Sequence, residues 1–285
     1  MSTTTNLHDS ANRSIYNPAI ALQFFRSAGK PQDIPQGKTI FTENEKGMPF
    51  LLMPHRMYLL LEGEVSVLAE NEPIATVRRG EIFGEMAAIE QTPRSAAAVA
   101  KTPCRVIALD DKQFHAALAK KPEFALMLMS IMVERLRDTI GRLSAADALS
   151  ADAEWKEAVV LDKDLISDLE QLLGPAARFR YNAEKVIMRE GHFGVVLFVV
   201  IEGRVAIRVG NSIVERVGPG GVFGEMALVD RTPRLATAIA ETDCVMLAIS
   251  RHMFLYLVKK SPRFGAALLR TVSERARFMA SRCKA

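Results

Sequence analysis

A long internal repeat constrains this chain more than any other feature of its sequence. Phe-Gly-Glu-Met-Ala followed by Thr-Pro-Arg occurs between Gly80 and Ala97, and both strings recur between Gly220 and Thr237, an offset of 140 residues. The same offset relates residues outside the motif, which are Gly63 and Gly203, Cys104 and Cys244, Phe114 and Phe254, Pro122-Glu-Phe124 and Pro262-Arg-Phe264, and Glu134-Arg135 and Glu274-Arg275. Such a period is too long for a solenoid of short units. The sequence therefore predicts one domain present twice.

Chain length and composition agree with two soluble domains. The 285 residues, 49% hydrophobic and 25% charged, suit a soluble protein with about 100–200 residues per domain. The densest apolar run, Phe124 to Val133, is about half of the roughly 20 residues that a membrane span needs. The start shows no signal peptide, so we expect a cytoplasmic protein without a membrane segment. The predicted boundaries are a flexible tail at 1–17, a first domain at 18–145 and a second at 146–285.

Charge, cysteine and histidine patterns exclude several kinds of site. The net charge of +4 is spread over short basic clusters, whereas direct nucleic-acid binding needs a concentrated basic face. The three cysteines form no Cys-x-x-Cys pair, and Cys104 and Cys244 stand in apolar runs typical of buried strands. The five histidines lack the spacing of metal ligands. We therefore expect no metal, no cofactor and no direct contact with nucleic acid.

Within each copy, short strand-like runs come first and helical sequence follows. Apolar runs separated by glycine turns are typical of a small antiparallel barrel, and they lie at 58–63, 64–68, 74–77, 96–100 and 105–109, and again at 197–201, 204–209 and 213–217. The predicted fold class is α+β, with two tandem antiparallel β jelly-roll barrels, each with flanking helices.

The closing helices carry apolar stripes at spacings of three and four residues. One stripe runs from Leu128 to Leu143, and its counterpart lies between Arg263 and Met279. Such a stripe usually packs on its own domain, and this is the favoured interpretation. The alternatives are a moving lid or a seam of a homodimer formed through these helices.

The repeated motif has a chemistry that follows from its residue types. Gly84 and its counterpart allow the backbone to approach a ligand closely, and the following Glu-Met-Ala resembles a helix start whose N–H groups can face an anion. A carboxylate at Glu85 can accept hydroxyl hydrogen bonds, and a guanidinium at Arg94 suits bidentate contact with a phosphate. Together they describe a site for a small sugar phosphate. The structural alternative is a salt bridge on a barrel turn.

The motif resembles that of the cyclic nucleotide-binding domain family, in tandem, as in regulatory subunits of the cAMP-dependent kinase and in bacterial relatives. The resemblance extends from about Ile40 to the C-terminus. It implies that Glu85 and Glu225 bind the ribose 2′-hydroxyl and that Arg94 and Arg234 bind the cyclic phosphate. It implies further contacts from the rest of each motif, namely Phe83, Gly84, Met86, Ala87, Ser95 and Ala96, and Phe223, Gly224, Met226, Ala227, Leu235 and Ala236.

The resemblance also implies a residue that covers the base, and it leaves the base itself open. Trp155, the only tryptophan, and Phe278 are the candidates, although Trp155 could instead pack the domain junction. Ser95 does not decide between cAMP and cGMP, and Leu235 lacks a hydroxyl at the matching place, so the two sites are expected to differ. We expect cAMP because it is the commoner ligand of such domains, with cGMP as the alternative.

Three other functions compete with a cyclic nucleotide sensor that acts on an unidentified downstream protein. The strands and helix after Arg234 use the remaining residues, so no recognition helix of a transcription factor is expected. Asn12-Arg-Ser14 is a poor match to the inhibitor segment of kinase regulatory subunits, so kinase inhibition has no support in the sequence. We find no activated nucleophile, so an enzyme is not expected. An interaction protein whose sites have drifted remains an alternative, against which the intact Glu and Arg of both copies argue.

Overall fold

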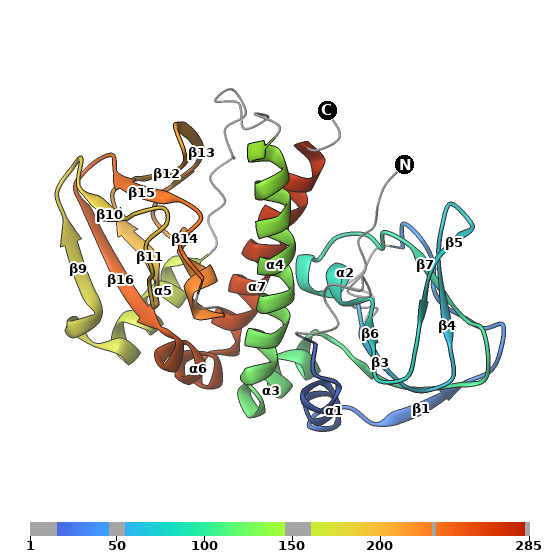
Figure 1. The fold of residues 1–285 in the computed structure, drawn as a ribbon. Coiled ribbons are helices and arrows are strands. Elements are labelled where there is room, and N and C mark those ends of the chain that lie inside the picture. The colour runs from blue at the N-terminus through green and yellow to red at the C-terminus, as the bar shows by residue number, and fades with distance from the viewer. Residues whose placement is uncertain (1–15, 46–54, 146–160, 230–231, 283–285) are drawn as a thin grey trace. The chain divides into compact units, whose positions relative to one another are not determined.

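The computed structural model describes residues 16–45, 55–145, 161–229 and 232–282 (Figure 1). The chain divides into two compact units, residues 1–131 and 132–285. The division falls inside α4 (Glu123–Ala145), whereas the sequence placed the domain boundary after that helix, at 145. Trp155 and most of the predicted tail lie outside the described residues, so the predictions made for them stay predictions.

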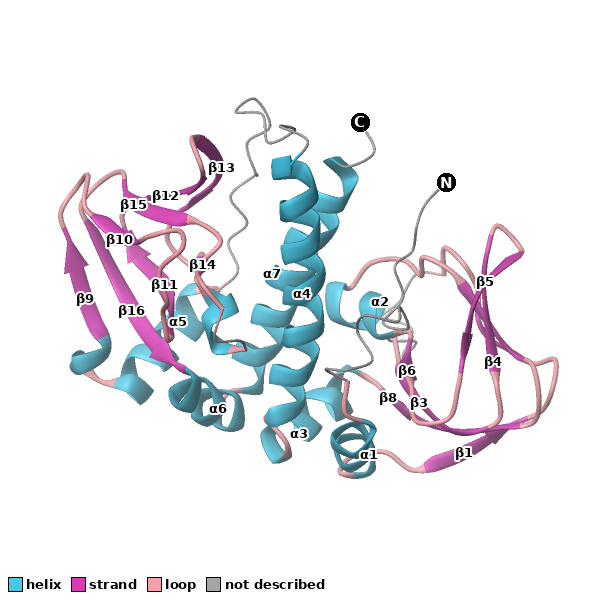
Figure 2. Ribbon diagram, viewed as in Figure 1, coloured by secondary structure: helices cyan, strands magenta, loops and turns pink. Residues whose placement is uncertain are grey.

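The first unit contains two four-stranded antiparallel sheets (Figure 2). One has the order β1-β8-β3-β6 and the other β2-β7-β4-β5. The strands are β1 (Pro31–Ile34), β2 (Thr39–Phe41), β3 (Met57–Glu62), β4 (Val65–Ala69), β5 (Glu72–Val77), β6 (Ile82–Phe83), β7 (Ala97–Ala100) and β8 (Cys104–Leu109).

The second unit repeats this topology strand for strand. Its sheets have the orders β14-β11-β16-β9 and β10-β15-β12-β13. The strands are β9 (Arg178–Tyr181), β10 (Val186–Met188), β11 (Val196–Glu202), β12 (Val205–Val209), β13 (Ser212–Val217), β14 (Val222–Phe223), β15 (Thr237–Ala240) and β16 (Cys244–Ser250). The predicted tandem of antiparallel jelly rolls with helices is confirmed. Barrel closure is not, because the edge strands of one sheet do not pair with those of the other within the described residues.

Alternating apolar residues fill the space between the two sheets of each unit. In the first unit Val65, Val67 and Val106 point into a shared cluster, since every second side chain of a strand faces the same side. Cys104 and Cys244 are buried and free, as their apolar surroundings predicted. The cluster of the second unit also takes in residues of two helices, α4 and α7 (Pro262–Arg282).

Shorter helices also flank the strands, as the predicted fold class requires, although the sequence analysis gave no residue ranges for them. Their start signals are nevertheless present: Asn17 caps α1 (Pro18–Arg26), and Asp110 with Gln113 forms a capping box on α3 (Asp111–Lys120). The second unit has α5 (Lys163–Leu173), the 3₁₀ helix η3 (Pro175–Ala177) and α6 (Arg251–Lys260). No helix among the described residues has the length and apolar character of a membrane span.

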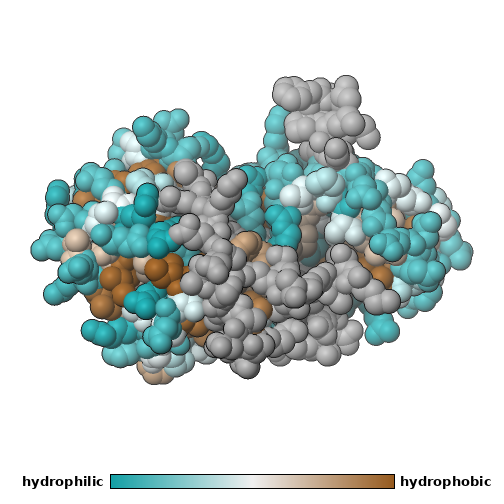
Figure 3. Space-filling model, turned by 90° about the horizontal axis from the view of Figure 1, so that it is seen from above, coloured by the Kyte–Doolittle hydropathy of each residue, from teal (hydrophilic) through white to brown (hydrophobic). Residues whose placement is uncertain are grey.

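The described residues form a mostly hydrophilic surface in the view of Figure 3. Over the second unit, on the left of that view, hydrophobic side chains gather and reach the surface. The second unit also contains the cleft described below.

Candidate functional site

Each copy of the repeated motif forms a sharp turn that only glycine suits. Gly84 directly follows β6 and has a φ of 71°, and Gly224 directly follows β14 and has a φ of 76°. Both angles are left-handed, a conformation that other residues rarely adopt. A Cβ would lie 2.8 Å from Nη1 of Arg94 at the first turn, and 2.9 Å from Nη1 of Arg234 at the second. The short helices α2 (Glu85–Glu90) and η4 (Glu225–Leu228) then begin, as predicted. The glycine therefore makes room for the arginine.

The two motif arginines are held by main-chain carbonyls in the same way. Arg94 donates from Nη1 to the Gly84 carbonyl at 2.6 Å and from Nη2 to the Arg56 carbonyl at 2.7 Å. Arg234 donates to the Gly224 carbonyl at 2.8 Å and to the Val196 carbonyl at 2.7 Å. Both side chains come from the loop after the short helix and are buried, at 3% and 8% exposure. The geometry of the guanidinium is thus reproduced in both copies.

Burial disfavours the charged form of Arg94 and of Arg234. It lowers the pKa of Arg94 and of Arg234, and nearby groups, among them Tyr58 for Arg94 and Glu225 for Arg234, oppose that change. Nε of Arg94 is buried and has no hydrogen-bond partner among the described residues. Because buried donors are nearly always paired, an anion that accepts from Nε would complete the site. The Phe41 ring lies 4.1 Å from Cζ of this guanidinium and contributes a cation–π contact.

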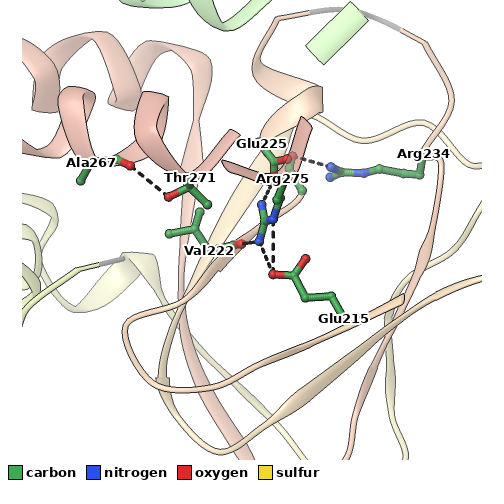
Figure 4. Close-up of polar contacts among 8 residues, drawn as sticks. Glu215, Val222, Glu225, Arg234, Ala267, Thr271 and Arg275 are labelled. Carbon is green, nitrogen blue, oxygen red and sulfur yellow. Dashed lines mark hydrogen bonds and ion pairs between the residues drawn. The ribbon is translucent and has the colours of Figure 1, made fainter. Parts of the chain in front are cut away.

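The motif carboxylates are buried beside the arginines. Glu85 is 5% exposed and Glu225 is 4% exposed. In the second unit Nη1 of Arg275, from α7, lies 3.1 Å from Oε2 of Glu225. The opposite side of that guanidinium binds Glu215 of β13 at 2.9 Å and also donates to the Val222 carbonyl. Figure 4 shows Arg275 between the two carboxylates, with Arg234 beyond Glu225.

Two carboxylates share one guanidinium in this cluster, and the pKa values reflect it. Attraction by Glu215 and Glu225 outweighs desolvation and raises the pKa of Arg275, which stays charged. For Glu215 desolvation outweighs the attraction of Arg275, so its pKa is raised. Glu225, at the start of η4, is therefore tied directly to the terminal helix α7.

A cleft that is partly open to solvent lies in front of the second motif. One end is polar, with Glu215, Glu225, Arg234 and Arg275, and the remainder is mainly apolar. The other lining residues are Leu136, Arg137, Ile140, Met188, Ile207, Val209, Val214, Phe223, Gly224, Met226, Thr232, Pro233, Leu235, Ala236 and Met279. The cleft thus offers charge at one end and an apolar surface at the other.

Most predicted site residues of the second copy lie in this cleft. Phe223, Gly224, Met226, Leu235 and Ala236 line it together with the Glu and Arg of the motif. The side chain of Ala227 lies outside the described residues. Phe278 packs against the core cluster and is absent from the lining, which its neighbour Met279 joins.

The first copy has the same glycine turn and the same arginine contacts. Phe83 is buried and stacks on Tyr58 at 5.0 Å between ring centroids. Ala87 and Ala96 are buried, Met86 is half-buried, and Ser95 is exposed. The ligand contacts assigned to these residues stay predictions.

Several residues of the second site were missed. Arg275 repeats Arg135 in the sequence, so the repeat itself could have indicated it. Glu215 corresponds to Ala75, and no pattern indicates an acid that only one copy carries. A Cβ on Gly194 would lie 2.3 Å from Nη2 of Arg234, so this glycine lies directly against the guanidinium. Among the described residues no group of His, Cys, Asp or Glu is arranged to hold a metal ion.

Several solved structures resemble the chain at low identity. The cAMP-bound PfPKA-R (141-441) is 21% identical, with 85% of each chain covered and a TM-score of 0.33. The regulatory domain of Toxoplasma gondii PKA with cAMP is 20% identical, covering 92% of this chain and 97% of that one, with a TM-score of 0.31. A regulatory subunit of a cAMP-independent protein kinase A from Trypanosoma brucei is 19% identical, covering 87% and 90%, with a TM-score of 0.32.

The family model of the cyclic nucleotide-binding domain matches the sequence twice, at residues 31–121 and 178–261. Each match contains one complete motif, from the glycine turn to the buried arginine. The two segments together span more than half of the chain, and the protein belongs to the cyclic nucleotide-binding domain family.

Proposed function

We propose that the protein is a non-enzymatic sensor that binds one cyclic nucleotide in each domain. The observation that carries this proposal is the duplicated clamp, in which Arg94 and Arg234 are buried and fixed by equivalent carbonyls. A guanidinium fixed in this way is prepared for the cyclic phosphate. Glu85 and Glu225 would accept hydrogen bonds from the ribose hydroxyl.

The rest of the second cleft suits the remainder of such a ligand. Main-chain N–H groups at the start of η4, from Gly224 to Ala227, would donate to the phosphate, as the N–H groups of a helix start can. Val209, Val214 and Met279 provide apolar surface for a purine. A nucleotide has the same two ends, one charged and one flat and mainly apolar.

The contact between Glu225 and Arg275 supports coupling of occupancy to the terminal helix. A ribose hydroxyl that donates a hydrogen bond to Glu225 would weaken the ion pair between this carboxylate and Arg275. Arg275 belongs to α7, so the ion pair connects the ligand to this helix. A ligand shifts a conformational equilibrium only by its differential affinity for the two arrangements. We propose that α7 is the element whose position depends on the ligand and that it reports occupancy to a downstream protein, with a homodimer through the helices as the alternative route.

We propose cAMP as the ligand, with cGMP as the alternative. The two sites need not agree, because the second cleft carries Glu215 and Leu235 where the first copy has Ala75 and Ser95. Each nucleotide must therefore be tested at each site.

The proposal is tested by equilibrium dialysis of the full chain, stripped of retained ligand, with labelled cAMP and cGMP. Arg94→Ala should abolish tight binding at the first site and Arg234→Ala at the second, because loss of a charged contact costs about 2–5 kcal/mol, or about 30-fold to several thousand-fold in affinity. Arg270→Ala, an exposed arginine on α7, is the control. Unchanged binding in the double variant Arg94→Ala with Arg234→Ala would refute the assignment.

A further inference from the structure

The second cleft is lined in part by a helix that precedes the second jelly roll. Leu136, Arg137 and Ile140 of α4 line the cleft, and all three belong to the unit that starts at residue 132. Leu136, Ile140 and Leu143 are 2%, 9% and 3% exposed and join the core cluster of the second unit. These residues lie before β9, the first strand of that unit, and outside the second matched segment at 178–261.

Arg137 reaches the loop that carries the motif arginine. Its Nη1 donates to the Pro233 carbonyl at 3.3 Å, and Pro233 directly precedes Arg234. The side chain is half-buried and lines the cleft with Thr232, Pro233 and Arg234. The burial of Leu136 and Ile140 on either side of Arg137 in the helix fixes the helix face that Arg137 presents to the cleft.

The charges of the lining point to the same residue. The charged residues that line the cleft are Arg137, Arg234, Arg275, Glu215 and Glu225. Arg275 is engaged by both carboxylates. The lining therefore has three arginines and two glutamates, a formal charge of one positive unit, and a cyclic phosphodiester has one negative charge. In a partly buried cleft that charge is screened less than at the surface.

We propose that Arg137 is a ligand-binding residue of the second site and that α4 completes this site. On this proposal, which rests on the proposed function, a second guanidinium binds the anionic group alongside Arg234. The part of α4 that lines this site belongs to the second unit, which starts at residue 132.

The test uses the full chain with Arg94→Ala, which leaves only the second site to be measured. Calorimetry with cAMP and with cGMP then compares Arg137→Gln, Arg137→Lys and the control Arg270→Gln, an exposed arginine on α7. Arg137→Gln should weaken binding about 10- to 100-fold, the value of a hydrogen bond to a charged group. Arg137→Lys should retain part of the affinity because it keeps the charge, and Arg270→Gln should be within twofold of the parent.

Two further results separate binding from folding and from the proposed function. The affinity of the parent should fall more steeply with salt than that of Arg137→Gln, because one ion contact fewer is screened. An unchanged affinity in Arg137→Gln, or a loss of affinity with an unchanged salt dependence, would overturn the proposal. A wild-type protein that binds neither nucleotide would instead refute the proposed function itself.

Discussion

Replacing Arg275 by methionine should strongly destabilise the second domain. The Arg275 side chain is 8% exposed and lies between Glu215, at 14%, and Glu225, at 5%. Its loss would leave two carboxylates facing each other in a buried site and the Val222 carbonyl without this donor. Removing one partner of a buried ion pair costs about 3–5 kcal/mol. Since a domain is stable by only about 5–15 kcal/mol, this loss is a large share of the total.

The free energy of unfolding should be measured by urea denaturation followed by circular dichroism. The matched control is Arg263→Met, because Arg263 binds Asp162 at 2.8 Å in a pair that is 61% and 57% exposed, and exposed pairs contribute about 0–1 kcal/mol. Replacing Glu215 and Glu225 by glutamine in the Arg275→Met background should recover much of the loss, since no unpaired charge then remains buried. An Arg275→Met protein as stable as the Arg263→Met control would refute this reasoning.

Three further predictions follow from buried groups of the two sites. Burial raises the pKa of Glu215 above 4.5, so the folded state binds the proton of this carboxyl more tightly than the unfolded state does. The free energy of unfolding should therefore fall as pH rises from about 4.5 through the raised pKa. In Glu215→Gln the denaturation midpoint should not show this fall. The pKa of His55 is lowered from 6.5, chiefly by burial and further by Arg94, so the first domain should lose stability as pH falls below about 6.5, and His55→Gln should not show that loss. Gly194→Ala should weaken nucleotide binding at the second site, because its Cβ would lie 2.3 Å from Nη2 of Arg234; equal affinity in calorimetry would show that the guanidinium can move freely.

The repeat was sufficient to predict the fold class and the position of both motifs. Gly84 and Gly224 adopt the expected left-handed turn, and the Glu and Arg of each motif are brought together behind it. These features are local, since about ten residues separate the glycine from the arginine, and local geometry follows from residue type. For a single copy, a salt bridge on a barrel turn would have been a stronger alternative, and the second copy of the motif argues against it.

The partner of an amphipathic stripe was not predictable in the same way. The stripe from Leu128 to Leu143 was expected to pack on its own domain, but Leu136, Ile140 and Leu143 pack into the core of the second unit. This part of the prediction was wrong. Periodicity shows which face of a helix is buried and says nothing of what buries it.

Contacts between residues far apart in the sequence were also missed. Arg275 of α7 binds Glu215 of β13 although 60 residues separate them in the sequence. A charged residue in an amphipathic helix usually marks the solvent face. Only the tertiary structure shows that Arg275 is buried against two acids.

The number of nucleotides bound per chain tests the central claim most directly. The full chain would be unfolded, refolded to remove retained ligand, and titrated by calorimetry with cAMP and then with cGMP. Two intact motifs predict two bound cyclic nucleotides per chain, because each domain has a buried arginine and carboxylate in the same arrangement. Absence of binding by either nucleotide, with the refolded protein shown to be native by its thermal transition, would contradict the account.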